Sequence, residues 1–303
     1  MEQTDILILG AGPAGLTAAI YASRSGHKVI ILEKGVIGGQ IASSWLVENY
    51  PGVKKTSGQE LTAVMAEQAK SFGTKIVEFA EVTSIDLHKK EVKTPDAAYA
   101  AKAIIIATGN RERKLSVPGE TELKGRGVSY CATCDAPFFK GKEVAVVGGG
   151  NSALEESLHL AKFASKITII HRREEFKAEK KLQAEISKNP KIKLLMDCAV
   201  SKINGKEKVE SIEVENLKTE KKAELKVSGV FIYVGMLPNS DLFKNQLKTD
   251  EAGFIITNEK METSIPGVFA AGDVRESPIK QLTTAAGDGT IASIFAGAAC
   301  KKD

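Results

Sequence analysis

Two stretches of similar design decide the fold, and the first is DILILGAGPAGLTAAIYASRSGHKVIILE at residues 5–33. Its apolar start predicts a buried strand, which runs into a glycine-rich turn at residues 10–15. A helix is predicted from there to about Ser25, with Gly26 as the residue that follows its end. The next apolar run predicts a second strand that ends in Glu33. Together these elements form the βαβ unit of a dinucleotide-binding domain.

The same design returns as EVAVVGGGNSALEESLHLAKFASKITIIHRR at residues 143–173. The first glycine and the end of the second strand are 23 positions apart in both units, from residue 10 to 33 and from 148 to 171. One glycine motif is a weak signal, but two with the same spacing, each between a strand and a helix, are much stronger. The sequence therefore predicts an α/β protein with two Rossmann-like (three-layer ββα) nucleotide-binding domains.

The glycines of such turns serve distinct purposes. The first allows a tight turn, the second lets the backbone approach a pyrophosphate, and the third allows the helix to pack closely on the strand. The pyrophosphate then lies at the positive end of the helix. An unrelated α/β fold with glycine-rich turns is the alternative. The predicted cofactor-binding residues of the two turns are Gly10, Gly12, Pro13, Ala14 and Gly15, and then Gly148, Gly150, Asn151 and Ser152, with Ala153 in place of the third glycine.

The two units differ at the end of their second strands. Glu33 is placed to accept hydrogen bonds from both ribose hydroxyls, which excludes a 2′-phosphate. The second unit instead has His171, Arg172 and Arg173, with Lys177 predicted one helical turn further on. A cationic cluster complements a 2′-phosphate. We therefore predict FAD in the first unit and NADPH in the second, and a solvated run of basic residues is the alternative.

The chain also returns to the first domain near its C-terminus. Residues 268–273, VFAAGD, predict another strand that ends in an acidic residue, and an Ala- and Gly-rich helix follows at about 281–298. This arrangement suits the ribityl and pyrophosphate part of FAD. The second domain is thus predicted to be inserted into the first. The predicted bounds are 1–112 with 243–303 for the FAD domain and 113–242 for the NADPH domain.

Four cysteines occur in the chain, and only Cys131 and Cys134 are close together. A two-residue spacer lets both sulfurs reach disulfide geometry in one turn, and a helix start lowers the thiol pKa. Asp135 adjoins the pair and could return a proton to a leaving thiolate. A zinc knuckle would need two more ligands, and a structural disulfide is unusual in a cytosolic chain. The remaining two, Cys198 and Cys300, fit ordinary core and tail positions, and we predict no metal site.

The composition sets broad limits on the function. A length of 303 residues suggests two domains, and 43% hydrophobic with 26% charged residues is typical of a globular protein. A net charge of +4 is too small to indicate a nucleic-acid partner. No apolar stretch approaches the roughly 20 residues of a membrane span. Since Glu2 and Asp5 lie where a signal peptide would be basic, we expect a cytoplasmic protein.

Over essentially its whole length the chain resembles the low-molecular-weight thioredoxin reductases. The matching motifs are Gly10–Gly15, Gly38–Gln40, Glu48–Gly52, Ala107–Gly109, Cys131–Asp135, His171–Arg173 and Ala271–Val274. The resemblance implies a homodimer with one FAD per subunit. It further implies that Cys134 is nearer the flavin, that Cys131 attacks the disulfide of thioredoxin, and that Asp135 is the acid. Further FAD contacts are expected at Lys34, Gly39, Gln40, Asn49, Thr108, Gly109, Gly272, Asp273, Lys280 and Gln281.

Three positions depart from the family pattern. Ala136 stands where a glycine is usual, and Lys280 where an arginine is usual. Lys177 replaces an arginine of the phosphate cluster, which keeps the charge but loses the bidentate guanidinium. This change leaves NADH or ferredoxin open as donors, although the cluster at residues 171–173 favours NADPH.

These observations predict an enzyme that moves electrons from NADPH through FAD to the Cys131–Cys134 pair and on to oxidised thioredoxin. One alternative is a flavin disulfide reductase or dithiol oxidase of the same fold with another partner or donor, such as a glutaredoxin-like protein, ferredoxin or NADH. Another is a non-catalytic FAD-binding scaffold, which the intact dithiol disfavours.

Overall fold

The computed structural model describes residues 1–44 and 46–301. The chain divides into two compact units, Met1–Arg111 with Leu237–Asp303, and Glu112–Met236. The second unit is an insertion between the two parts of the first. Residues 237–242, which the sequence placed in the inserted domain, lie in the first unit. They are held there because Asn239 exchanges hydrogen bonds with Thr108, and Ser240 donates one to the Gly253 carbonyl at 2.6 Å.

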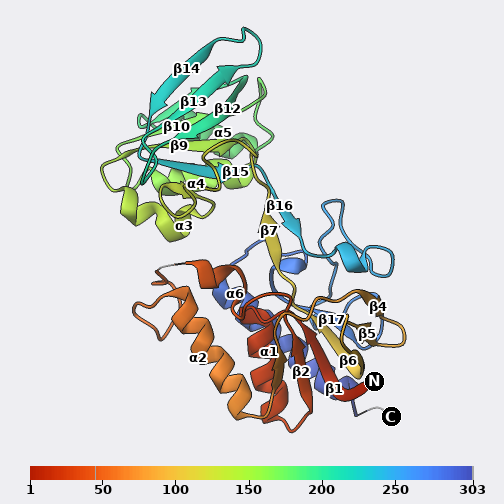
Figure 1. Ribbon diagram of the computed structural model, residues 1–303. Helices are drawn as coiled ribbons and strands as arrows, with labels where there is room; N and C mark the ends of the chain where they lie inside the picture. The colour runs from red at the N-terminus through yellow and green to blue at the C-terminus, as the bar shows by residue number, and fades with distance from the viewer. Residues whose placement is uncertain (45, 302–303) are drawn as a thin grey trace. The chain divides into compact units, whose positions relative to one another are not determined.

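The first unit is built on a mainly parallel sheet in the order β3-β2-β1-β6-β5-β4, with β17 parallel to β6 (Figure 1). An antiparallel extension, β4 and β5, continues beyond β6. The strands are β1 Glu2–Leu9, β2 Val29–Leu32, β3 Lys75–Val77, β4 Ser84–Asp86, β5 Glu91–Lys93, β6 Ala98–Ile106 and β17 Val268–Ala270. The helices are α1 Pro13–Arg24, α2 Gly58–Ser71 and α6 Leu282–Ala299.

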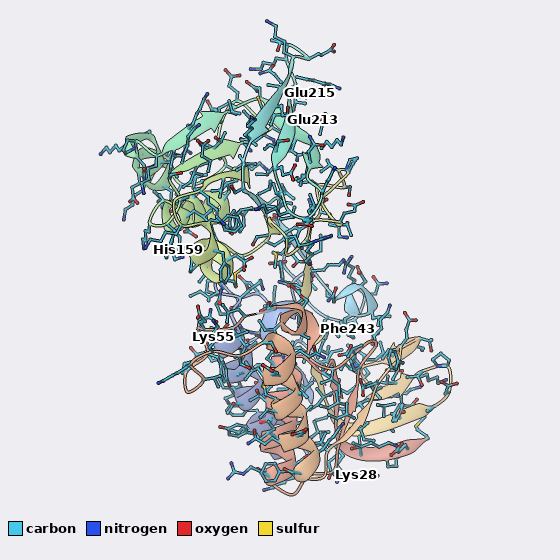
Figure 2. All side chains as sticks on the ribbon, turned by 60° about the vertical axis from the view of Figure 1, so that its left-hand side comes forward. Lys28, Lys55, His159, Glu213, Glu215 and Phe243 are labelled. Carbon is cyan, nitrogen blue, oxygen red and sulfur yellow. A yellow bond between two sulfur atoms is a disulfide. The ribbon has the colours of Figure 1, made fainter. Side chains whose placement is uncertain are left out.

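Side chains of this sheet alternate between two buried layers, because successive residues of a strand point to opposite faces. Ile6 and Ile8 of β1 face the layer that includes residues of α1, α2 and α6. Leu7 and Leu9 face the opposite layer, which includes the fully buried Phe243 (labelled in Figure 2). The sheet therefore has apolar cover on both faces, as the continuous apolar strands of the sequence predict.

Helix α1 ends as predicted. Its last residue is Arg24, and Gly26 follows the cap with φ of +84°. The Gly26 N–H donates to the Ser23 carbonyl and the His27 N–H to the Ala22 carbonyl, which is a Schellman closure.

The Ala- and Gly-rich helix α6 packs closely against α1 (Figure 1). A Cβ at Gly289 would collide with the Ala14 carbonyl, so this position requires glycine. Helix α1 is thus the element on which the C-terminal helix packs.

The second unit repeats the architecture with a parallel sheet in the order β11-β10-β9-β15-β8. One face is covered by α3, α4 and α5, and the other by the antiparallel sheet β12-β13-β14, which makes three layers. The strands are β8 Val128–Ser129, β9 Glu143–Gly148, β10 Lys166–Ile170, β11 Ile192–Leu195, β12 Cys198–Asn204, β13 Ser211–Asn216, β14 Lys222–Lys226 and β15 Gly229–Tyr233. The helices are α3 Ala132–Asp135, α4 Asn151–Leu160 and α5 Lys180–Lys188. The predicted α/β class with two Rossmann-like units is confirmed.

Short elements complete the chain. The crossings between the units include β7 Asn110–Glu112 and β16 Met236–Pro238, which pair with each other. Short 3₁₀ helices lie at Gly39–Ser43, Ala136–Phe139, Asp241–Phe243 and Gly272–Val274. Among the described residues, no helix combines the length and apolarity needed to cross a bilayer.

Candidate functional site

In the first glycine turn, close packing requires glycine at two positions, and a third position has room for a side chain. Gly10 has φ of +105°, and a Cβ there would collide with the Ala107 carbonyl oxygen. A Cβ at Gly15 would collide with the Gly10 carbonyl oxygen. At Gly12, in contrast, a Cβ would meet only the Gly39 Cα, at 4.0 Å. Gly12 therefore lies on the open side of the turn, where a phosphate can approach the backbone.

Helix α1 presents its N-terminus at this turn. Gly12 is the N-cap and supplies no side-chain hydrogen bond, and Pro13 occupies the first turn. The uncapped N–H groups of the next residues and the positive helix end suit a bound phosphate. This arrangement fits the pyrophosphate of a dinucleotide.

Glu33 follows β2 and is fixed by the backbone of the turn. Its Oε2 accepts a hydrogen bond from the Ala11 N–H at 2.7 Å, and its Oε1 accepts one from the Gly35 N–H at 2.9 Å. Each oxygen keeps a further lone pair, so both can still accept from ribose hydroxyls. The neighbouring Lys34 instead extends into solvent and pairs with Glu81 at 2.6 Å. The structure therefore gives Lys34 a partner other than a cofactor.

A backbone hydrogen bond of the preceding residue, Gly38, brings Gly39 and Gln40 to the same turn. The Gly38 N–H donates to the Ala11 carbonyl at 2.9 Å. The Gln40 amide donates to the Oδ1 of Asn110 at 2.8 Å and also to the Asn110 carbonyl. The Asn110 side chain is buried, and its Nδ2 has no hydrogen-bond partner among the described residues. Because an unpaired buried donor costs about 1–3 kcal/mol, this atom fits a site where a ligand supplies the acceptor.

Thr108 and Gly109 follow β6 and use their polar groups internally. The Thr108 hydroxyl donates to the Asn239 carbonyl at 2.8 Å, and the Gly109 carbonyl accepts from the Asn239 N–H at 3.0 Å. Asn49 donates to the Gln281 side chain at 3.4 Å, and Gln281 also caps α6. These residues shape the edge of the site, and direct contact with a cofactor stays a prediction for each of them.

Gly272 and Asp273 follow β17, beside the start of α6. Burial raises the pKa of Asp273; the nearby Lys280 opposes this effect and Asp288 adds to it. The Lys280 ammonium donates to the carbonyls of Asp273 and Arg275 and lies 4.1 Å from the centre of the Phe254 ring. Burial lowers the pKa of Lys280. The half-buried Asp273 follows the carboxyl end of β17, at the edge where open α/β sheets bind their ligands.

The open position at Gly12 gives a direct test of this site. We expect Gly12→Ala to fold normally, since φ is −78° and the Cβ has room, but to bind flavin about tenfold more weakly because the methyl group occupies the phosphate approach. Thermal unfolding and the flavin dissociation constant measure the two effects. Gly287→Ala, on α6 with no atom near the added Cβ, is the matched control. Wild-type flavin affinity in Gly12→Ala would contradict the assignment.

The second glycine turn shows the same division. A Cβ at Gly148 would collide with the Tyr233 carbonyl oxygen, and one at Gly149 with the His171 ring, whereas Gly150 faces open space. Gly150 is the N-cap of α4 and, like Gly12, supplies no side-chain cap. Asn151 is tied to the loop before α5, since its Oδ1 accepts from the Glu179 N–H at 2.9 Å. The exposed Ser152 follows in the first turn of α4. The turn therefore fits a second pyrophosphate.

The basic cluster is only partly as predicted. Arg172, Arg173 and Lys177 are exposed and form no ion pair within the described part of the chain. The segment between Arg173 and Lys177 is a loop, so the predicted helical turn is wrong, and the next helix begins at Lys180. The Lys177 N–H still donates to the Gly149 carbonyl at 2.8 Å, which brings this residue to the glycine turn.

His171 differs from the other residues of the cluster in its environment. Its ring is buried and its Nε2 lies 3.1 Å from the Glu175 carbonyl. Burial lowers the pKa of His171, and the neighbouring Arg173 and Arg172 lower it further. The hydrogen bond to the Glu175 carbonyl and the charge of Asp197 oppose this shift. The lowered pKa and the burial favour the neutral imidazole and argue against the predicted cationic role of His171, whereas Arg172, Arg173 and Lys177 are exposed.

Cys131 and Cys134 are joined as a disulfide at the start of the four-residue helix α3. Cys131 is the N-cap, and its Sγ accepts a hydrogen bond from the Cys134 N–H at 3.2 Å. The Asp135 N–H donates to the Cys131 carbonyl at 3.1 Å. Both cysteines are half-buried. The predicted placement of the pair at a helix start is confirmed.

Asp135 lies within the polar contacts of this turn. Its Oδ2 accepts a hydrogen bond from the Ser129 hydroxyl at 2.6 Å, and the Ser129 oxygen accepts the Cys131 N–H at 3.1 Å. Burial raises the pKa of Asp135, and the Ser129 hydrogen bond opposes the shift. A carboxyl that holds its proton to higher pH is suited to act as an acid toward a thiolate.

Three residues beside the dithiol were missed by the sequence reasoning. They are Ser129, Tyr233, whose hydroxyl accepts the Ala132 N–H at 2.6 Å, and Glu156, which accepts from the Thr133 hydroxyl at 3.3 Å. Ser129 could have been considered because it stands two residues before Cys131. Tyr233 is separated from Ala132 by 101 positions, so no local pattern indicates the contact.

Comparison with known proteins agrees with this geometry. Residues 4–289 match the family model for pyridine nucleotide-disulphide oxidoreductases. A thioredoxin reductase of Bacillus subtilis is 48% identical over 292 residues, which cover 95% of this chain and 92% of the relative. One of Peptoclostridium acidaminophilum is 45% identical over 298 residues, 95% of this chain and 94% of the relative. The crystal structure of thioredoxin reductase from Streptococcus pyogenes shares 44% identity, covers 99% of both chains and has a TM-score of 0.91.

Two nucleotide-binding turns, on either side of a cysteine pair in the sequence, would suit several kinds of flavoenzyme. The similarity to thioredoxin reductases, however, spans nearly the whole chain at high identity. The chain therefore belongs to the pyridine nucleotide-disulphide oxidoreductase family and, within it, to the group of the low-molecular-weight thioredoxin reductases.

Proposed function

We propose that this protein is a thioredoxin-disulfide reductase that passes electrons from NADPH through FAD to Cys131 and Cys134, and then to oxidised thioredoxin. The observation that carries the proposal is the cysteine pair beside Asp135 in a chain whose relatives over nearly full length are thioredoxin reductases. Membership of the family implies a flavin and a nicotinamide nucleotide. FAD in the first unit, NADPH in the second, a homodimer and a cytoplasmic location are the finer parts of the proposal.

The cysteine pair performs the exchange with thioredoxin. A bound flavin supplies the two-electron chemistry that links the nicotinamide nucleotide to the disulfide. In the reduced protein, the Cys131 thiolate attacks a sulfur of the thioredoxin disulfide, which forms a mixed disulfide and releases one thioredoxin thiolate. Cys134 then attacks the Cys131 sulfur, which restores the Cys131–Cys134 bond and releases the second thiolate. Asp135 protonates one leaving thiolate, and the proton that the Cys134 thiol loses as it attacks passes to the other, so two electrons and two protons reach thioredoxin in all.

A comparison of electron donors tests the proposal. Steady-state turnover with one thioredoxin is measured with NADPH, NADH and reduced ferredoxin in turn, and NADPH is expected to be the fastest. A panel of oxidised partners, including a glutaredoxin-like protein, follows with the preferred donor. Slow turnover on every thioredoxin, together with rapid turnover on another partner, would overturn the assignment.

The exposed arginines predict the choice of nucleotide. Arg172→Ala is expected to raise the KM for NADPH about tenfold while changing that for NADH little, because a lost guanidinium–phosphate contact is worth about 1.4 kcal/mol or more. The measurement is kcat/KM for each nucleotide. Arg126→Ala, which removes an exposed arginine of the same unit, is the matched control. Equal losses for both nucleotides in Arg172→Ala would show that the cluster does not bind the 2′-phosphate.

A further inference from the structure

The helix that carries the dithiol is too short to hold its own shape. Helix α3 has four residues, and the first turn of an isolated helix is costly to form. In the oxidised protein the Cys131–Cys134 bond closes the turn. Besides the disulfide, the hydrogen bonds within the turn run from the Cys134 and Asp135 N–H groups to Cys131 and from the Ala136 N–H to the Ala132 carbonyl. The reduced pair therefore depends on anchors outside α3 to keep its two sulfurs adjacent.

Tyr233 is such an anchor. It is the last residue of β15, in the register in which Tyr233 pairs with Gly148 of β9, so its backbone is fixed by the central sheet. Its hydroxyl accepts the Ala132 N–H at 2.6 Å, and Ala132 is fully buried. Without this acceptor a buried N–H would be unpaired, at a cost of about 1–3 kcal/mol. The contact ties the first residue of α3 to the rigid sheet.

The Tyr233 phenol can accept this hydrogen bond whether the cysteine pair is oxidised or reduced. Burial raises the pKa of Tyr233, and the charges of Glu156 and Asp135 raise it further, while the hydrogen bond from the Ala132 N–H opposes the shift. The side chain therefore stays a neutral phenol across the pH range of the reaction, and its oxygen remains available as an acceptor whether the pair is a disulfide or a dithiol.

We propose that the Tyr233 hydroxyl is a positioning group that holds Cys131 and Cys134 adjacent in the reduced protein and thereby makes the pair a stronger reductant. In the oxidised protein the disulfide keeps the turn from relaxing, so removing the Tyr233 hydroxyl destabilises this state by the full cost of an unpaired Ala132 N–H. In the reduced protein the turn can open, so removing the hydroxyl destabilises this state less. The hydroxyl thus stabilises the disulfide more than the dithiol. The inference rests on the proposed function only in taking the pair as redox-active.

The test is the thiol–disulfide equilibrium of Tyr233→Phe, which removes one oxygen and keeps the ring. Flavin-loaded protein is equilibrated anaerobically with mixtures of reduced and oxidised dithiothreitol. In that exchange the Cys131–Cys134 disulfide becomes two thiols, dithiothreitol becomes its cyclic disulfide, and two electrons with two protons pass to the protein. The thiols are then alkylated and counted by mass. We expect the equilibrium to shift toward the dithiol by about threefold to tenfold, which corresponds to about 15 to 30 mV.

Tyr130→Phe is the matched control. Tyr130 immediately precedes Cys131, but its hydroxyl donates to the buried Glu120 carboxylate at 2.7 Å rather than contacting α3. The thiol–disulfide equilibrium of Tyr130→Phe is expected to match that of the wild type within twofold. An unchanged equilibrium in Tyr233→Phe, or an equal shift in Tyr130→Phe, would overturn the proposal.

A second measurement needs no variant. Amide hydrogen exchange of the segment that includes Ala132 is compared between the oxidised and reduced wild-type protein. Continued protection after reduction supports the anchor, and loss of protection on reduction would overturn it. Neither experiment contains thioredoxin. Failure of the thioredoxin assay with the expected dithiol equilibrium would therefore count against the proposed function alone.

Discussion

Replacing Cys134 with serine is expected to abolish thioredoxin reduction, with kcat/KM lower by about 10³-fold or more, while the nicotinamide nucleotide still bleaches the flavin absorbance. The reason is that serine cannot form the Cys131–Cys134 bond, so the variant has no disulfide to receive electrons or to be restored after attack on thioredoxin. Cys131 remains and can still form a mixed disulfide, but no second thiol resolves it.

An anaerobic reductive titration measures the same loss independently of thioredoxin. The wild-type protein is expected to accept two electrons per subunit more than Cys134→Ser, since the disulfide is a two-electron acceptor. Cys198→Ser is the matched control, because Cys198 is a buried free cysteine whose Sγ accepts a hydrogen bond from the Asn216 side chain at 3.7 Å. Thioredoxin reduction at the wild-type rate by Cys134→Ser, or equal electron uptake by both proteins, would contradict the role of the pair.

Replacing Asp135 with asparagine is expected to slow thioredoxin reduction about 100-fold, which is the lower end of the contribution of a general acid. The substitution keeps the size of the side chain and an oxygen that can accept the Ser129 hydroxyl, so the turn around Cys131 should stay intact. What the variant loses is the proton that Asp135 donates to a leaving thiolate. Stopped-flow measurement of the exchange with thioredoxin separates this step from the reduction of the flavin.

The pH dependence of that step follows from the direction of the pKa shift. The protonated carboxyl is the donating form, so its contribution is largest below its pKa and declines as pH rises through it. Because burial raises the pKa of Asp135, the decline falls at higher pH than for an ordinary aspartate. Asp135→Asn should lack this decline and be slow throughout. Asp197→Asn, a substitution of the same kind at a residue paired with Lys218, should behave as wild type. A decline retained in Asp135→Asn would assign it to another group.

Much of the fold could be predicted because its signals are local. The strand, glycine turn and helix at residues 5–33 and 143–173 follow from apolar runs and glycine spacing. The boundary at the second crossing could not be placed as well. Residues 237–242 belong to the first unit through the bonds of Asn239 to Thr108, which is 131 positions away, and of Ser240 to Gly253, which is 13 positions away.

The charge of the basic cluster could not be predicted from the sequence for a different reason. His171, Arg172 and Arg173 are equivalent as a run of basic letters, but only the folded chain buries the imidazole against Gly149 and leaves the guanidinium groups exposed. Burial penalises the charged form and lowers the pKa of His171, so the three residues are not equivalent in charge. Protonation depends on solvent access, which periodicity does not encode.

For the dithiol, the sequence by itself determined the close pair of cysteines, Cys131 and Cys134, at a predicted helix start, and it predicted Asp135 beside them as the acid. Only the tertiary structure decided how the turn is held. Ser129 and Tyr233 reach it from the ends of β8 and β15, which parallel pairing brings to one edge of the sheet. Contacts between residues about a hundred positions apart depend on strand order and register. These are properties of the assembled sheet, whereas the reactivity of a close cysteine pair is already present in its local sequence.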